Sequence, residues 1–451
     1  MPAVVSAEEY LVTRVRQHGG YRMNQSELGE GRTGQGSNRS DMQQGALAPV
    51  TQQPTSPEDE VLEAAPGLEA VQAQRAVGPG SGIALCLSGG GYRAMLFHLG
   101  TLWRLNELGY LERLSRVSSV SGGSITAGAL ALAWHKLRFS GDPIRGAENF
   151  KEEVVLPVRG LADKTIDIWA VLMGLFWGGT TSTHIAAYYN RYLFRDRNLQ
   201  ALPKRGQGPD FVFNASNLQS GVLWQSSRGY IGDYRVGWIK NPDIGVAQAV
   251  AASSAFPPFL SPMVLTFDGK KHQFKRGSSS DLNQPPYTTN VLLTDGGVYD
   301  NLGLETAWKY FDTVLVSDGG GKMQAAKKPG RDWVRQVLRV RDMTDNQVRA
   351  LRKRQLIASY RAPESDENHR KGAYWGIRTE IADYELADAL KCPPENTAKL
   401  ANVATRLGHL DSTTQERLIN WGYAICDAAI RTYVDETLPT HRGFPYPKAK
   451  V

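Results

Sequence analysis

The chain has 451 residues, of which 41% are hydrophobic and 22% charged, and its formal net charge is +7. This ordinary globular composition excludes a wholly disordered chain and leaves room for one large α/β domain with additions. The moderate positive charge is compatible with an anionic lipid surface or with nucleic acid. We find no zinc-type Cys/His spacing and no basic DNA-reading motif, so we expect no nucleic-acid partner.

The number and spacing of the cysteines and the length of the apolar stretches indicate the cellular compartment in which the protein is expected. Three cysteines, Cys86, Cys392 and Cys426, are odd in number and far apart, which argues against a disulfide framework and favours a reducing compartment. The N-terminus has acidic residues where a secretory signal needs a long apolar run. No stretch approaches the roughly 18 apolar residues of a membrane span. We therefore predict a cytoplasmic protein, with peripheral contact to a membrane surface compatible with its charge.

The first part of the chain leads from a polar segment into an ordered unit. Residues 1–80 are rich in Gly, Gln, Ser and Pro, which predicts a mobile extension with short helices only. The apolar run Ile83–Leu87 then has the pattern of a buried strand. After Gly89–Gly91, residues Ala94–Leu108 carry apolar side chains at helical spacing, and Gly109 is a natural terminator of that helix.

A second strand–turn–helix unit follows, with a strand at Val117–Val120, a helix at Gly122–Lys136 and Ser121 between them. Further strands are predicted at 210–214, 291–294 and 313–317. Strands that alternate with helices imply a three-layer α/β fold, with a mostly parallel sheet covered on both faces. Ligands bind beyond the carboxyl ends of such strands, so the glycine run, Ser121 and Asp295 are expected to share one site.

From about Gly321 the sequence turns basic and helical. The last clear element is a helix at Thr413–Tyr433, for which Ser412 with Gln415, or Thr413 with Glu416, would form a capping box. We therefore divide the chain into a mobile extension (1–80), a catalytic core (81–320) and a helical extension packed on the core (321–451).

The two glycine-rich turns have the residue types that acyl-transfer chemistry needs. A serine on a strand-to-helix turn projects its hydroxyl from a strained bend, which makes Ser121 the candidate nucleophile. Bare backbone N–H groups at Gly89–Gly91 can bind the oxyanion that such an attack creates. Serines in glycine-rich turns are common, and three others lie nearby, namely Ser118, Ser119 and Ser124.

A base is also needed, and Asp295 ends an apolar strand before two glycines. In isolation such an aspartate is more often a turn or cap residue, and Asp318 repeats the pattern. A hydrolase with a Ser-Asp-His triad would need a histidine downstream, and His409 or His441 could fill that position. Both lie in the polar C-terminal region, where a surface histidine is the more frequent case.

Together these segments resemble the patatin-like phospholipase family. The resemblance rests on Gly-Gly-Gly-Tyr-Arg at 89–93, Ser-Gly-Gly at 121–123 and Asp-Gly-Gly-Val-Tyr-Asp-Asn at 295–301. Residues 211–218 and 251–258 add two further matches, so that the resemblance covers about residues 82–320. The stretch Ser-Gly-Gly-Gly-Tyr-Arg-Ala-Met at 88–95 also resembles cytosolic phospholipases of the related Ser–Asp type.

The resemblance implies a serine lipid acyl hydrolase with a Ser–Asp dyad, a lipid substrate and no catalytic histidine. We find no set of residues that requires a metal, and we expect no cofactor. It places the nucleophile on Ser121, the base on Asp295 rather than Asp318, and the oxyanion hole on Gly89, Gly90, Gly91 and Arg93. Two positions depart from the usual pattern: Ser119 replaces the first glycine of the nucleophile elbow, and Ala94 follows Arg93 where a glycine is frequent.

One segment and two alternatives remain. Residues 168–179 form an apolar run with two tryptophans, which is either a buried helix or an element at the lipid–water boundary. The alternatives to the dyad hydrolase are an esterase with a Ser-Asp-His triad and a catalytically silent lipid-binding protein on the same fold.

Overall fold

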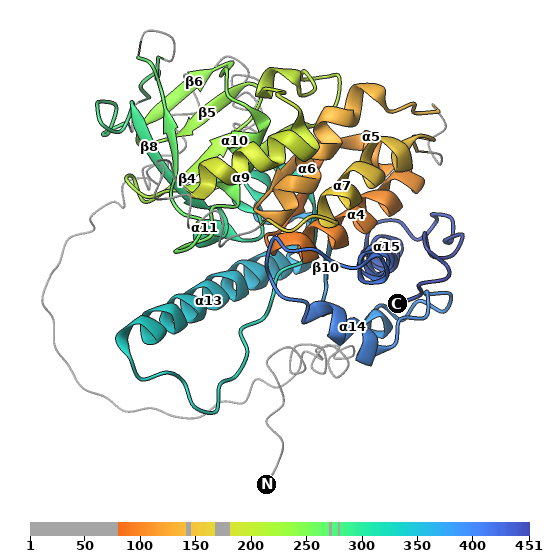
Figure 1. Ribbon diagram of the computed structural model, residues 1–451. Coiled ribbons are helices and arrows are strands. Elements are labelled where there is room, and N and C mark those ends of the chain that lie inside the picture. The colour runs from red at the N-terminus through yellow and green to blue at the C-terminus, as the bar shows by residue number, and fades with distance from the viewer. Residues whose placement is uncertain (1–79, 141–145, 167–180, 270–272, 278–279) are drawn as a thin grey trace, which may run out of the picture. The chain divides into compact units, whose positions relative to one another are not determined.

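A computed structural model describes residues 80–140, 146–166, 181–269, 273–277 and 280–451 (Figure 1). The predicted mobile extension, apart from residue 80, and the apolar run at 168–179 lie outside these residues. The described helices are α4 (Gly91–Glu107), α5 (Tyr110–Arg113), α6 (Gly122–Ala133), α7 (Leu156–Ala162), α9 (Thr181–Tyr189), α10 (Val246–Ser253), α11 (Gly297–Asp300), α12 (Glu305–Trp308), α13 (Trp333–Arg361), α14 (Pro394–Ala401) and α15 (Ser412–Tyr433). Short 3-10 or π turns occur at Trp134–Lys136, Lys151–Val155, Asn190–Phe194, Leu199–Ala201 and Ile381–Tyr384.

A ten-stranded sheet organises the described residues. Its parallel centre has the order β10-β9-β1-β2-β3, made of Lys371–Gly376, Phe311–Asp318, Gly80–Leu87, Leu114–Ser119 and Asp210–Asn217. Beyond β3 the strands run antiparallel, as β4 (Leu223–Ser226), β5 (Tyr230–Asp233) and β6 (Gly237–Lys240). A second antiparallel branch, β8 (Asn290–Asp295) with β7 (Met263–Thr266), also pairs with β3.

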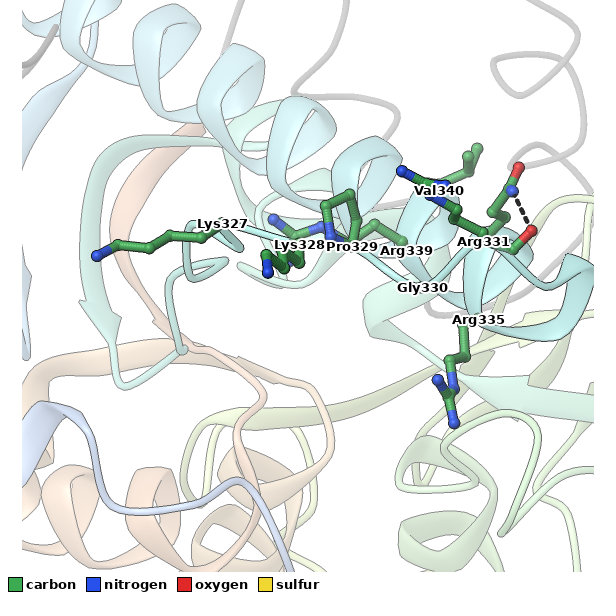
Figure 2. Close-up of a pocket in the computed structure, with 9 residues that line it drawn as sticks. Lys327, Lys328, Pro329, Gly330, Arg331, Arg335, Arg339 and Val340 are labelled. Atoms are coloured by element: carbon green, nitrogen blue, oxygen red, sulfur yellow. Dashed lines mark hydrogen bonds between the residues drawn. The ribbon is translucent and has the colours of Figure 1, made fainter.

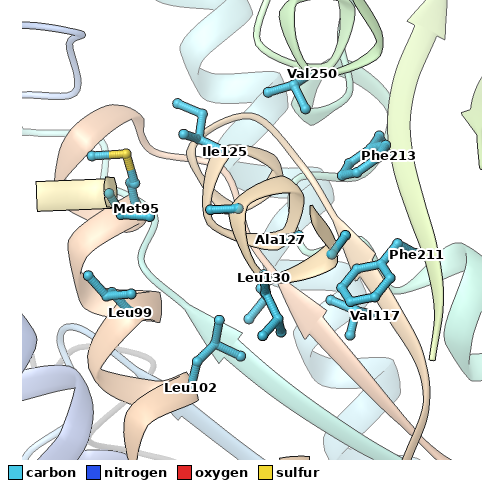
Figure 3. Packing of buried hydrophobic residues seen from close by; sticks show 14 of the residues in the cluster. Met95, Leu99, Leu102, Val117, Ile125, Ala127, Leu130, Phe211, Phe213 and Val250 are labelled. Carbon is cyan, nitrogen blue, oxygen red and sulfur yellow. The ribbon is translucent and has the colours of Figure 1, made fainter. Parts of the chain in front are cut away.

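Both faces of the sheet are covered, as the predicted three-layer α/β class requires. On β1, Leu85 and Leu87 belong to the main core, whereas the alternate residues Ala84 and Cys86 pack in a second cluster with Leu356 of α13. Figure 3 shows the main core, where Met95, Leu99 and Leu102 of α4 face Ile125 and Leu130 of α6. Because successive side chains of a strand point to opposite faces of the sheet, β1 contributes to an apolar layer on each face.

The helix α15 packs closely across α4. A Cβ added at Gly100 would lie 1.9 Å from the Ile419 carbonyl oxygen, and one at Gly422 would lie 1.9 Å from the Phe97 carbonyl oxygen. Only glycine permits this approach of the two backbones.

The N-terminus of α15 corrects a prediction, because the helix is capped by Asp411, whose carboxylate accepts from the Thr414 N–H at 2.9 Å. Neither proposed capping box forms, because Asp411 is the N-cap and the Gln415 N–H donates to the Asp411 carbonyl at 3.0 Å.

Two further expectations bear on the site. The strand that ends at Asp295 was expected in a parallel sheet, but β8 runs antiparallel to β3, with Asp295 opposite Ala215. The C-terminal region also contributes a strand, β10, which sequence periodicity did not indicate.

All three cysteines are buried and free. Among the described helices, none is both long enough and apolar enough to cross a bilayer.

Candidate active site

Ser121 lies in the sharp turn between β2 and α6, as expected. Its backbone has φ 52°, a left-handed conformation that non-glycine residues rarely adopt, and it caps the N-terminus of α6. The Ser121 N–H donates to Ser253 Oγ at 3.0 Å, and the Ser121 carbonyl accepts from the Ser124 N–H at 2.9 Å. The residue keeps 9% of its surface exposed. Its backbone is therefore fixed on both sides of the turn.

The neighbouring serines have structural partners. Ser118 Oγ donates to the Gly303 carbonyl at 2.6 Å, and Ser124 Oγ lies 3.0 Å from Ser119 Oγ and 2.8 Å from Ser253 Oγ. All of them are fully buried. These hydrogen bonds join β2, α6 and the end of α10 beneath the Ser121 turn.

Asp295 is held at the same place by the segment that follows α10. Its N–H donates to the Ala255 carbonyl at 2.9 Å, and its own carbonyl accepts from Ser216 Oγ at 2.9 Å. The carboxylate Oδ1 accepts from the Gly297 N–H at 2.7 Å, and hydrogen bonding with the Ser121 side chain lowers the pKa of the same carboxyl group. The antiparallel strand β8 thus delivers Asp295 to Ser121.

Burial governs the charge of this carboxyl group. Only 4% of the residue is exposed, and loss of hydration raises the pKa of Asp295 to about 7, against the opposing hydrogen bonds from Gly297 and Ser121. A carboxylate that titrates near neutrality can both take and return a proton, as a general base requires.

The glycine run closes the other side of the site. A Cβ at Gly89 would lie 3.2 Å from Ser121 Cβ and 2.4 Å from Asn301 Oδ1, so the run lies directly against the serine. The Gly89 N–H donates to the Asn301 carbonyl at 3.1 Å and is therefore engaged. Gly90 caps α4, and Gly91 has φ 61°, so both amides lie at the positive end of that helix.

Arg93 lies behind the glycine run. Its Nε donates to the Gly319 carbonyl at 3.1 Å and its Nη1 to the Val403 carbonyl at 2.6 Å. Burial lowers the pKa of Arg93 to about 10, so the guanidinium stays charged at neutral pH. Within the described part of the chain Nη2 has no hydrogen-bond partner, and a Cβ on Gly90 would lie 3.1 Å from it. Arg93 therefore places a buried positive charge beside Gly90.

The other candidate residues lie elsewhere. Asp318 forms an ion pair with Arg349 at 3.1 Å and accepts from Tyr374 at 2.8 Å; burial opposes ionisation, but these partners lower the pKa of Asp318. His409 contacts the Asp163 carbonyl at 3.1 Å, and His441 contacts the Asp388 carbonyl at 2.8 Å. Both histidines are bound on partly exposed loops through backbone carbonyls.

Several residues around the site were not predicted from the sequence. His98 bridges Ser317 Oγ and the Ser88 carbonyl, each at 2.9 Å, and burial lowers the pKa of its imidazole to about 4, which keeps it neutral. Tyr189, at the end of α9, is buried where the charge of Asp295 acts on it. Two others could have been found, because Asn301 ends the Asp-Gly-Gly-Val-Tyr-Asp-Asn segment and Ser253 lies in the matching segment 251–258.

One family model and several solved structures match parts of this chain. Residues 85–308 match the model of the patatin-like phospholipase family. No curated protein matches the chain. Among solved structures, human GIVD cytosolic phospholipase A2 is 15% identical with a TM-score of 0.46, and the match covers 82% of this chain and 61% of that one. The same human protein in complex with methyl gamma-linolenyl fluorophosphonate is 14% identical with a TM-score of 0.46, covering 83% and 61%.

A more distant match is VipD from Legionella pneumophila, which is 14% identical with a TM-score of 0.31, covering 77% of this chain and 66% of that one. This chain thus spans about three fifths of the human protein's length. The family match rests on the segment that holds both glycine-rich turns and the Asp295 turn. Over residues 85–308, the chain belongs to the patatin-like phospholipase family.

Proposed function

We propose that this protein hydrolyses acyl esters of phospholipids or related lipids through an acyl-enzyme formed on Ser121. The observation that carries the proposal is the pairing of Ser121, in a left-handed turn, with a buried carboxyl group whose pKa is raised to about 7. A serine hydroxyl needs an adjacent base to become a nucleophile, and Asp295 is the titratable group that contacts it.

In the proposed first step, Ser121 Oγ attacks the ester carbonyl carbon while its proton moves to the Asp295 carboxylate. The carbonyl oxygen becomes an oxyanion, which the Gly90 and Gly91 N–H groups bind. The positive charge of Arg93 stabilises it further, because the guanidinium lies close to Gly90. Because the Gly89 N–H is already bonded to Asn301, this residue shapes the pocket through its missing side chain.

The tetrahedral intermediate then breaks its bond to the alcohol oxygen, which takes the proton from Asp295 and leaves as the lyso product. Asp295, again a carboxylate, accepts a proton from water while the water oxygen attacks the acyl carbon. Collapse of the second intermediate returns that proton to Ser121 Oγ and releases the fatty acid. The whole cycle uses one acid–base group, so no histidine is needed.

The decisive experiment is labelling with a fluorophosphonate ester, which reacts only with an activated serine, followed by mass spectrometry of the labelled peptide. We expect the label on Ser121, and Ser121→Ala should lose both labelling and ester hydrolysis. Ser412→Ala, which removes a hydroxyl far along the chain, is the matched control and should react as wild type. Labelling of another residue, or full hydrolysis by Ser121→Ala, would overturn the proposal.

A further inference from the structure

Helix α13 exposes an unusual amount of apolar surface. Six of the thirteen large exposed hydrophobic side chains in the described residues belong to this one helix. Trp333 is 78% exposed, Val337 59% and Val340 58%, and their spacing of four and three residues places them on one face. We call these three residues the apolar stripe. Contiguous apolar surface of this kind marks an interaction site in a water-soluble domain.

The opposite end of α13 is firmly packed. Leu356 and Ser359 are buried, and Tyr360 donates its hydroxyl proton to the Val314 carbonyl at 2.6 Å. Arg352 pairs with Glu305 at 2.6 Å. The helix is therefore anchored to the sheet by its C-terminal half, and the stripe lies on the half that extends beyond these contacts (Figure 1).

Positive charge gathers beside the stripe. Residues 322–361 hold twelve lysines and arginines against three aspartates, a formal charge of +9, where the whole chain has +7. A hollow of about 840 Å³ opens between the loop before α13 and its first turns, and five cations line it, namely Lys327, Lys328, Arg331, Arg335 and Arg339 (Figure 2). Val340 lines the hollow as well, so the apolar stripe and the cations meet there.

This surface continues toward the active site. The Arg341 guanidinium lies 4.6 Å from the centre of the Phe256 ring and donates to the Pro257 carbonyl. Phe256 directly follows Ala255, whose carbonyl accepts from the Asp295 N–H, and it is 43% exposed. Phe259, three residues on, is 53% exposed. Apolar side chains thus extend from the stripe to the edge of the site.

We propose that the apolar stripe and the five cations of the hollow dock this protein on a membrane surface that contains anionic phospholipid. Apolar side chains enter the boundary between headgroups and acyl chains, while lysine and arginine bind the lipid phosphates. Nucleic acid would use the cations but leave the stripe in water, and an apolar protein groove would leave the cations unpaired. Docking requires no hydrolysis, so it can fail or succeed independently of the proposed function.

The test is co-sedimentation of the full chain with vesicles of phosphatidylcholine alone and of phosphatidylcholine mixed with phosphatidylglycerol. Wild type should bind the mixed vesicles better, and added salt should weaken that binding. Each cation near an anionic surface contributes on the order of a fivefold gain in binding, so Lys327→Glu, Lys328→Glu and Arg331→Glu together should lose at least roughly a hundredfold. Trp333→Ser, Val337→Ser and Val340→Ser together should weaken binding to both kinds of vesicle.

Matched controls remove the same chemistry elsewhere. Lys391→Glu with Lys448→Glu, and Tyr433→Ser with Leu218→Ser, change exposed residues outside α13 and should bind as wild type. Ser121→Ala should also bind normally, and all the docking variants should keep their hydrolysis of a soluble short-chain ester. Unchanged vesicle binding in the charge and stripe variants would overturn the inference. Self-association of wild type that the stripe variant abolishes would assign the stripe to a second copy and also overturn it.

Discussion

The variant Asp295→Asn distinguishes the free-energy cost of burying the Asp295 carboxylate from the proposed role of this group as a base. The carboxyl group is buried, and its pKa rises from the ordinary 3.8 to about 7. Between these two values the folded protein keeps the proton while the unfolded chain releases it. The stability that this group contributes is therefore fully present below about pH 4 and is lost as the pH rises to about 7. Asparagine has nearly the same shape and cannot ionise, so Asp295→Asn lacks this loss.

The magnitude follows from the shift. One pKa unit corresponds to about 1.4 kcal/mol, so about three units give a loss of roughly 4 kcal/mol across the whole window. The part of this window that lies above about pH 5 is roughly two pH units wide, because the window ends at the pKa of about 7. The free energy of unfolding of Asp295→Asn minus that of wild type should therefore grow by about 3 kcal/mol over this interval. Hydrolysis should fall by orders of magnitude at every pH, because the base is gone.

The assay is urea unfolding of both proteins at several pH values, with ester hydrolysis measured on the same samples. Asp318→Asn is the matched control, because the pKa of Asp318 is lowered and its carboxylate is paired with Arg349. That variant should be less stable than wild type by a constant amount across the same interval. A constant difference for Asp295→Asn would show that its carboxyl group titrates normally, and the argument from burial would be refuted.

Three further outcomes are expected. Ser121→Gly should abolish hydrolysis yet raise the free energy of unfolding by up to about 1 kcal/mol, since glycine adopts φ 52° without strain; a destabilised variant in urea unfolding would contradict this. His409→Ala and His441→Ala should keep kcat/KM near the wild-type value, whereas a collapse in either folded variant would favour a Ser-Asp-His triad. Gly100→Ala should lower the thermal unfolding midpoint and cost several kcal/mol, about 3 or more, because its Cβ would meet the Ile419 carbonyl; an unchanged midpoint would show that α4 and α15 can separate freely.

Much of the fold was accessible from the sequence because its signals are local. Apolar runs predicted β1, β2, β3, β8 and β9, and Gly109 ends the region of α4 with φ 69°, as its position indicated. The direction of β8 was not accessible, because an apolar strand has the same pattern whether its neighbour is parallel or antiparallel. The short strands β4 to β6 were missed for a related reason, since four residues give too little periodicity.

The site shows the same division. Ser121 and the glycine run stand on turns that sequence can identify, and the structure brings them together with Asp295. Ser253, His98 and Tyr189 come from helices, and only tertiary packing brings their side chains to the site. The interpretation of residues 168–179, the domain boundaries, the cytoplasmic location, and the absence of a cofactor and of a nucleic-acid partner all stay predictions.

The crossing of α4 and α15 has a consequence for the order in which the protein can be made. Thr101 and Gly422, which meet at this crossing, are 321 residues apart in the chain. The glycine run begins α4, and α15 supplies the surface that buries the far side of that helix. A nascent chain therefore cannot bury the helix behind the proposed oxyanion pocket until α15 has left the ribosome. Synthesis that stops before α15 should therefore release polypeptides that lack the proposed hydrolysis, even though Ser121 and Asp295 are already present in them.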